Sequence, residues 1–219
     1  MDERVLTARI LLFDMDGTLV DSTAVVERTW HRFAARHGLD GAAVIADAHG
    51  RPTAETVARH LPAGADVTAE TARIVAAELA DMDGIVPVLG AAELVSELPA
   101  DSWAVVTSAD RELVERRMAA AGLQLPRVVV SADDVRCGKP DPEGYLRAAE
   151  LLGATAEEAV VFEDAAAGLL AARFSGASPV VVGGHDGPAA TGLPRVEDLR
   201  SVTATRGTDE ELLVRLHTR

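Results

Sequence analysis

Several short runs of apolar residues recur along the chain, and each run is continuous rather than alternating with polar positions. An uninterrupted apolar run of this kind is typical of a strand buried on both faces, as in a parallel sheet. The runs are Ala8–Asp14, Trp103–Thr107, Arg127–Ser131, Ala159–Phe162 and Pro179–Gly183. We therefore predict that each of these runs is a strand of one parallel sheet.

Helix signals lie between the later runs. Asp141–Pro142 combines an N-cap residue with a proline in the first turn, and Gly153 has the position of a C-terminal glycine. Thr155–Glu158 has the pattern of a capping box, but the next apolar run follows so closely that only a turn fits there. Strands and helices in alternation predict an α/β fold, a Rossmann-like parallel sheet with helices on both faces.

Residues 21–84 break this alternation, because apolar residues recur there at helical spacing and no convincing strand is found. The helical positions are Val26, Trp30 and Phe33 in one stretch, and Ala72, Val75 and Leu79 in another. We expect residues 1–20 and 85–219 to form the α/β core and residues 21–84 to form an all-helical cap. Such a cap would cover the carboxyl ends of the strands, where open α/β sheets bind their ligands.

The composition fits a globular protein, with 48% hydrophobic and 26% charged residues among 219. No stretch approaches the roughly 20 apolar residues that a membrane span requires. The first residues do not have the pattern of a secretory signal. The single cysteine, Cys137, suits a reducing compartment. We therefore expect a cytoplasmic protein without a membrane partner.

The charge balance excludes another class of partner. The chain has 21 basic and 35 acidic residues, a formal net charge of -14, and only 3% aromatic residues. Nucleic-acid binding needs a basic surface and usually aromatic stacking platforms, so we expect no nucleic-acid partner. Lys139 is the only lysine, and all other basic residues are arginine.

Polar segments follow four of the predicted strands, in the order of the chain. They are Asp14–Thr18, Thr107–Ser108, Gly138–Pro140 and Glu163–Asp164. Taken singly, each segment would be read as a helix cap or a turn. In a parallel sheet, however, all of them gather at one edge. Several carboxylates there suit Mg²⁺, and a hydroxyl with an ammonium group beside the metal suits a phosphate.

These segments resemble the motifs of the haloacid dehalogenase superfamily, and the resemblance covers nearly the whole chain. Asp14–Ser22 looks like the first motif, Thr107–Ser108 the second, Lys139 the third and Glu163–Asp164 the fourth. The helical insert is similar to the C1-type cap of subfamily I. The resemblance implies a Mg²⁺-dependent phosphatase that acts through an aspartyl-phosphate.

The resemblance also implies a role for each matched residue. Asp14 would be the nucleophile, and Asp16 would protonate the leaving group and then activate water. Mg²⁺ would be held by Asp14, by the backbone carbonyl of Asp16 and by Asp164, with Glu163 nearby or acting through water. The remaining phosphate oxygens would be bound by Thr107, the Ser108 backbone and Lys139.

A loop of the insert, His49–Thr53, resembles the cap loop of glycerol-phosphate and small sugar-phosphate phosphatases. The resemblance implies that His49 and Arg51 bind the leaving group of a small polyol or sugar phosphate. The chain departs from those phosphatases at Pro52, where they commonly carry an arginine.

Other activities of the superfamily match less well. Dehalogenases lack an acid at the position of Asp16, and phosphonate hydrolases use a cap lysine, which this chain does not contain. Hexose-phosphate mutases keep a histidine where this chain has Val26 and an arginine where it has Thr53, so mutase activity is disfavoured but stays open. A non-catalytic module that binds a phosphorylated metabolite also stays open, although Asp14 and Asp16 are both present.

Overall fold

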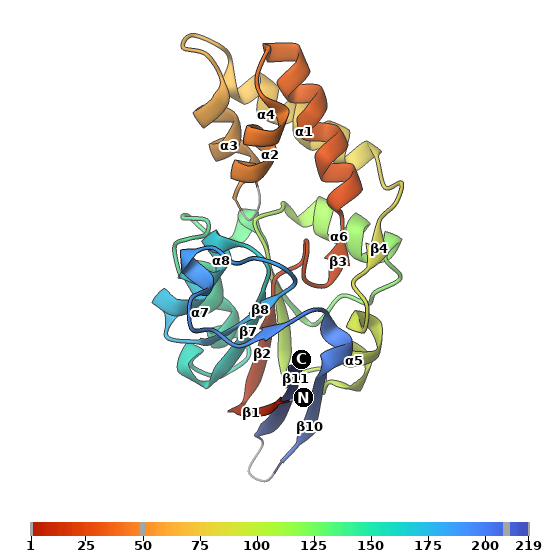
Figure 1. The fold of residues 1–219 in the computed structure, drawn as a ribbon, viewed down its shortest axis with the longest axis vertical. Helices are drawn as coiled ribbons and strands as arrows, with labels where there is room; N and C mark the ends of the chain where they lie inside the picture. Colours follow the sequence, from red (N-terminus) through yellow and green to blue (C-terminus); the bar gives the residue numbers. More distant parts are fainter. Residues whose placement is uncertain (1, 49–50, 208–210, 219) are drawn as a thin grey trace.

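The structure is a computed structural model that describes residues 2–48, 51–207 and 211–218. Among these residues, the main sheet contains six parallel strands in the order β6-β5-β2-β7-β8-β9 (Figure 1). Their bounds are β2 Ile10–Phe13, β5 Trp103–Val106, β6 Val128–Val130, β7 Ala159–Glu163, β8 Ser178–Val182 and β9 Arg195–Val196. The predicted parallel sheet is confirmed, and β9 is a strand that the apolar pattern did not indicate.

Helices cover both faces of this sheet, as predicted. They are α5 (Ala91–Glu97) and α6 (Arg111–Ala120) on one face, and α7 (Glu143–Leu151) and α8 (Ala166–Ser175) on the other. Alternate residues of β2 serve the two faces: Leu11 and Phe13 pack in the core with α5 and α6, whereas Ile10 and Leu12 pack with α7 and α8. The continuous apolar run therefore reflects a strand with no polar face.

The register of the strands brings their carboxyl ends to one edge. Phe13 of β2 lies opposite Phe162 of β7, and the two rings stack with centroids 5.0 Å apart. The next residue, Asp14, donates its backbone N–H to the Phe162 carbonyl at 3.0 Å. At the neighbouring strand, Thr107 N–H donates to the Val130 carbonyl at 2.9 Å. The polar segments thus begin at the same level of the sheet.

A second sheet was not predicted from the sequence. Among the described residues it contains three antiparallel strands in the order β1-β11-β10, with bounds β1 Asp2–Ala8, β11 Leu212–Thr218 and β10 Val202–Arg206. One face of this sheet packs on the core through Leu212, Val214 and Leu216, while β1 is exposed over much of its length. The predicted first strand, Ala8–Asp14, is accordingly divided at Arg9 between β1 and β2.

The segment between β2 and β5 is mostly helical, in agreement with the periodicity. Its helices are α1 (Thr23–His37), α2 (Gly41–Ala48), α3 (Thr53–His60) and α4 (Val67–Ala80). They form a bundle with its own apolar core around Trp30, Phe33 and Ile74, and Figure 1 shows this bundle beyond one end of the main sheet. A short antiparallel pair, β3 (Val20–Asp21) and β4 (Val86–Pro87), joins the chain entering the bundle to the chain leaving it.

The buried face of α4 differs from the sequence-based expectation. The apolar positions Ala72, Val75 and Leu79 are exposed or half-buried, and the buried residues include Glu70 and Glu78. Both glutamates are paired with arginines of neighbouring helices, which makes their burial tolerable. The helix was predicted correctly, but its buried face carries two paired glutamates beside Ile74.

Local signals elsewhere are confirmed, except that Pro142 and not Asp141 is the N-cap residue of α7. The Asp141 carboxylate accepts from the Glu143 backbone N–H at the start of α7, and Gly153 has a left-handed φ of 71° after its end. Thr155 forms the capping box of a single 3₁₀ turn. The 3₁₀ turns are η1 Ala132–Asp134, η2 Ala156–Glu158, η3 Pro188–Ala190 and η4 Leu199–Ser201. None of the helices in the described ranges is long and apolar enough to cross a membrane.

Candidate active site

The loop after β2 carries the first two candidate carboxylates. Asp14 is buried, and the loop turns back because the Met15 carbonyl accepts from the backbone of Leu19 and Val20, both at 2.9 Å. Gly17 adopts a left-handed φ of 85°, and a Cβ at this position would collide with the Asp164 carboxylate. Glycine is therefore required for the loop to approach the end of β7.

Lys139 lies at the centre of the site. It is only 5% exposed, and its Nζ donates to Asp14 Oδ1 at 2.5 Å, to Glu163 Oε1 at 2.6 Å and to the Val106 carbonyl at 3.0 Å. Burial alone would lower the pKa of Lys139, but Asp14 and Glu163 hold that pKa well above its usual range. The single lysine is therefore a fixed, buried positive charge that joins the ends of three strands.

Glu163, the last residue of β7, holds Lys139 in place. Its Oε1 also accepts from the Tyr145 hydroxyl at 2.8 Å, and its Oε2 accepts from the backbone of Asp164 and Ala165 at 3.1 and 3.2 Å. A Cβ at Gly168, on α8, would collide with this carboxylate, so glycine leaves the room that Glu163 needs. The apolar position of Tyr145 on α7 gave no sign of this contact.

More carboxylates than cations lie around Lys139. Asp14, Glu163 and Asp164 each offer an oxygen, and these oxygens lie within 4.8 Å of one another. Burial, together with the nearby carboxylates, outweighs the effect of Lys139 and raises the pKa of Asp14 to about 8. Burial likewise raises the pKa of Asp164 well above its usual range. The excess negative charge and the all-oxygen donor set fit a hard divalent cation.

The Asp16 side chain faces a different partner. Its Oδ2 lies 2.8 Å from Nη1 of Arg117, a buried residue in the last turn of α6. The other terminal nitrogen of Arg117, Nη2, donates to Glu78 Oε1 at 3.1 Å, and Glu78 belongs to α4. Sequence reasoning missed Arg117 and Glu78, because charged residues on helices are usually solvent-exposed.

Two of the candidate phosphate-binding residues, Thr107 and Ser108, line the same pocket as Asp14 and Asp164. Thr107 is buried and its Oγ1 accepts from the Ala109 backbone N–H at 3.1 Å, and Ser108 is half-buried beside it. The pocket lies between the main sheet and the helical bundle and has a volume of about 100 Å³. It brings together Asp14, Asp16, Asp164, Thr107, Ser108, Arg51, Thr53, Glu78 and Arg117. Lys139 does not line this pocket; it is bound to Asp14 and lines an adjoining pocket with Thr107 and Ser108.

Of the two candidate residues of the cap loop, the structure describes Arg51 but not His49. Arg51 lines the pocket, and its Nε lies 3.5 Å from Asp47 Oδ1. Asp47 also pairs with Arg59 and His60, so it anchors this end of the bundle. His49 lies outside the described residues.

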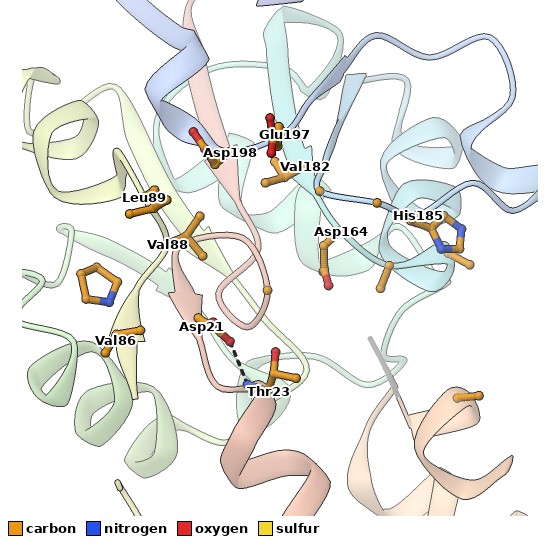
Figure 2. Close-up of a pocket in the computed structure, with 17 residues that line it drawn as sticks. Asp21, Thr23, Val86, Val88, Leu89, Asp164, Val182, His185, Glu197 and Asp198 are labelled. Carbon is orange, nitrogen blue, oxygen red and sulfur yellow. Dashed lines mark hydrogen bonds between the residues drawn. The ribbon is translucent and has the colours of Figure 1, made fainter. Parts of the chain in front are cut away.

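A wider pocket of about 740 Å³ opens on the other side of Asp164. Figure 2 shows it between the loop that carries Asp164, the end of β8 near His185, and the chain at Asp21 and Thr23. Gly17, Thr23 and Asp164 line both pockets. The two pockets therefore adjoin at the candidate metal-binding carboxylate.

Comparison with known proteins places these features in a family. The sequence profile of the haloacid dehalogenase-like hydrolases matches residues 8–176. The chain is 40% identical to hexitol phosphatase A of Escherichia coli strain K12 over 215 residues, covering 93% of this chain and 97% of that protein. It is 42% identical to validoxylamine A 7'-phosphate phosphatase of Streptomyces hygroscopicus subsp. limoneus over 175 residues, covering 77% and 82%. A crystal structure of a hydrolase from Pseudomonas syringae superimposes with a TM-score of 0.76 at 26% identity, covering 87% of this chain and 94% of that one.

Proposed function

The chain belongs to the haloacid dehalogenase-like hydrolase family and is a phosphatase. On this premise we propose that it depends on Mg²⁺ and hydrolyses a small polyol or sugar phosphate through an aspartyl-phosphate. The observation that carries the proposal is the position of Asp14. Its buried carboxylate follows the central strand β2, lies 2.5 Å from Lys139 Nζ and faces the excess of acidic oxygens.

In the proposed first step, an Asp14 carboxylate oxygen attacks phosphorus and the bond to the leaving oxygen breaks. Asp16 gives its proton to that oxygen, which leaves as an alcohol. In the second step, Asp16 takes a proton from water, whose oxygen attacks the phosphoryl group and releases Asp14 and inorganic phosphate. One group thus serves as acid and then as base.

Groups in and beside the pocket bind and orient the phosphoryl group. Lys139 and Thr107 supply an ammonium group and a hydroxyl at the ends of the neighbouring strands, where they would hold phosphoryl oxygens. A bound divalent cation would orient the same oxygens and offset their charge, held by Asp14, Asp164 and the Asp16 carbonyl. Because the whole chain carries a net charge of -14, attraction of an anionic substrate depends on these local cations.

We expect the inserted helices to supply the contacts that select the leaving group. We propose that residues 21–84 act as a cap on the core formed by residues 1–20 and 85–219. The pocket between them adjoins the wider pocket of about 740 Å³ at Asp164. Arg51 and Thr53 add polar groups that can hydrogen-bond to hydroxyls. Similarity to a hexitol phosphatase over nearly the whole chain supports a polyol or sugar phosphate as substrate.

The test is release of inorganic phosphate from a panel of hexitol, glycerol, hexose and nucleoside monophosphates, with Mg²⁺ or with EDTA. We expect polyol or sugar phosphates to have the highest kcat/KM, and turnover to need Mg²⁺. Asp14→Asn should abolish turnover, since an amide does not attack phosphorus, while Asp101→Asn, at an exposed position, is the matched control.

Two outcomes would contradict the proposal. Conversion of one hexose phosphate into another without phosphate release would identify a mutase. Full turnover by Asp14→Asn would exclude the aspartyl-phosphate.

A further inference from the structure

We infer that Arg117 is a positioning residue for the Asp16 carboxyl group, and that Glu78 on the inserted helix α4 completes this arrangement. Packing of the helical bundle on the core then sets where the acid–base group lies. The inference rests on the proposed function, because the acid–base role of Asp16 belongs to that proposal.

Three separate elements meet at Arg117. Its Nη1 is 2.8 Å from Asp16 Oδ2 on the loop after β2, and its Nη2 is 3.1 Å from Glu78 Oε1 on α4. Arg117 itself is on α6 and is 3% exposed, and Glu78 is 5% exposed. Since the guanidinium group is planar and rigid, a different carboxylate on each terminal nitrogen fixes both its position and its rotation.

Stability alone is a weak reason for a buried arginine between two carboxylates. Desolvation of such groups offsets most of their attraction, and apolar replacements of similar volume are often as stable. Burial indeed raises the pKa of Glu78 in spite of its contact with Arg117. The geometry at Asp16 offers a functional reason.

Arg117 engages one oxygen of Asp16 and leaves the other for chemistry. Oδ2 contacts Arg117, whereas Oδ1 is buried in the pocket and no group in the described ranges hydrogen-bonds to it. A guanidinium group stays protonated throughout the working pH range, so Arg117 orients Asp16 without exchanging its proton. Oδ1 is thereby held as the oxygen that gives a proton to the leaving group and takes one from water.

The same two helices provide a matched control. Arg116, the neighbour of Arg117 on α6, donates from Nη1 to the Leu79 carbonyl of α4 at 3.1 Å. Arg116 is half-exposed, does not line the pocket and is paired with Glu112. Substitution of Arg116 therefore weakens the contact between α6 and α4 without removing a partner of Asp16.

The expected signature is a change in leaving-group preference. Nitrophenolate leaves without much help from an acid, whereas the alkoxide of a polyol needs a proton as the bond breaks. The substrate ratio is kcat/KM for the polyol or sugar phosphate divided by kcat/KM for p-nitrophenyl phosphate. It reports the first step, in which Asp16 acts as an acid. A misplaced Asp16 lowers this ratio, and a general loss of folded protein leaves it unchanged.

The experiment measures kcat/KM at saturating Mg²⁺ for the best polyol or sugar phosphate and for p-nitrophenyl phosphate. For Arg117→Met we expect a loss on the polyol or sugar phosphate that exceeds the loss on p-nitrophenyl phosphate by about tenfold or more, up to the ~10²–10⁴-fold that complete loss of acid catalysis would cost. Glu78→Gln should show a smaller loss of the same kind. Arg116→Met should keep the wild-type ratio. The inhibition constant of inorganic phosphate should not change in any variant.

Several outcomes would overturn the inference. Equal losses on both substrates would make Arg117 a purely structural residue, and a weaker inhibition by phosphate would make it a substrate-binding residue. An unchanged ratio in Glu78→Gln would remove α4 from the arrangement. If Arg117→Met does not fold, the same substrate ratio is measured for Arg117→Lys and for Glu78→Gln. Arg117→Lys keeps the charge and one contact.

Failure of this inference is distinguishable from failure of the proposed function. A wild-type protein without Mg²⁺-dependent phosphate release overturns both. A wild-type protein that is active, with variants whose substrate ratio equals its own, overturns only the positioning role.

Discussion

At the scale of single residues, the site is organised around fixed pairs of opposite charge. Lys139 joins Asp14 to Glu163, and Arg117 joins Asp16 to Glu78. Each cation is almost fully buried, so removal of one partner leaves an uncompensated charge in a desolvated place. The phosphoryl group is the same in every phosphomonoester, so these buried pairs do not select among leaving groups.

Selection among leaving groups is expected to depend on Arg51. Arg51 and Arg59 both pair with Asp47, but Arg51 lines the pocket and Arg59 does not. Arg51→Ala should lower kcat/KM for the best polyol or sugar phosphate about tenfold more than for p-nitrophenyl phosphate, the size of one lost hydrogen bond to a charged group. Arg59→Ala is the matched control and should leave the substrate ratio unchanged. Equal effects of the two substitutions would show that Arg51 acts only through Asp47.

At the scale of elements, ion pairs connect the inserted helices in addition to their apolar core. Glu70 of α4 accepts from Arg36 of α1 at 3.0 Å, and His37 of α1 lies 3.3 Å from the same oxygen. Burial alone would raise the pKa of Glu70, but the contacts with Arg36 and His37 outweigh it and lower the pKa below its ordinary value of 4.5. Glu70 is therefore more easily ionised in the folded chain than in the unfolded chain.

This shift predicts a pH-dependent contribution to stability. A carboxylate whose pKa is lowered by folding stabilises the fold at pH values above its pKa in the unfolded chain. This contribution is lost as the pH falls through its pKa in the folded chain. At pH 7, Glu70→Gln should reduce the free energy of unfolding by about 1 kcal/mol. The difference from wild type should shrink as pH falls below about 4.5, as measured by urea unfolding at several pH values.

Glu112→Gln, which removes an exposed pair with Arg116, is the control. A constant difference across this range would argue against the ionic contact.

At the scale of the whole molecule, excess negative charge collects where the strands of the main sheet end. The chain has a net charge of -14, and the oxygens of Asp14, Glu163 and Asp164 lie within 4.8 Å of one another. A divalent cation bound there would relieve repulsion that exists only in the folded state. Binding to the folded state alone stabilises a protein by mass action, by about 2.7 kcal/mol at 100 times Kd.

Mg²⁺ should therefore raise the Tm of the protein, by roughly 5 °C at a Mg²⁺ concentration of about 100 times Kd for a chain of this size. Thermal unfolding in MgCl₂ is compared with unfolding in NaCl of equal ionic strength, because a highly acidic chain also responds to screening. Asp164→Asn should lose the response specific to Mg²⁺. An equal rise in NaCl, or an undiminished rise in Asp164→Asn, would contradict a metal site at these carboxylates.

The sequence by itself determined the central strands and the order of the polar segments at their ends. These features depend on local patterns: a strand covered on both faces needs a continuous apolar run, and parallel strands necessarily end at one edge. The helices of residues 21–84 and the glycine that follows α7 were predictable for the same reason. Arginine, aspartate and threonine near the candidate pocket were expected from motif resemblance, and the structure places Arg51, Asp16 and Thr107 in one pocket.

Tertiary structure alone decided which face of α4 is buried and which distant groups meet. The β1-β11-β10 sheet pairs Asp2 with Thr218, so neither strand carries a local sign of its partner. Glu78 and Arg117 have the polar character of solvent-exposed helix residues, and only the packing of α4 against α6 buries them beside Asp16. The physical reason is that a charged side chain is stable in the interior only when its counter-charge is brought to it, and residues distant in sequence supply that counter-charge.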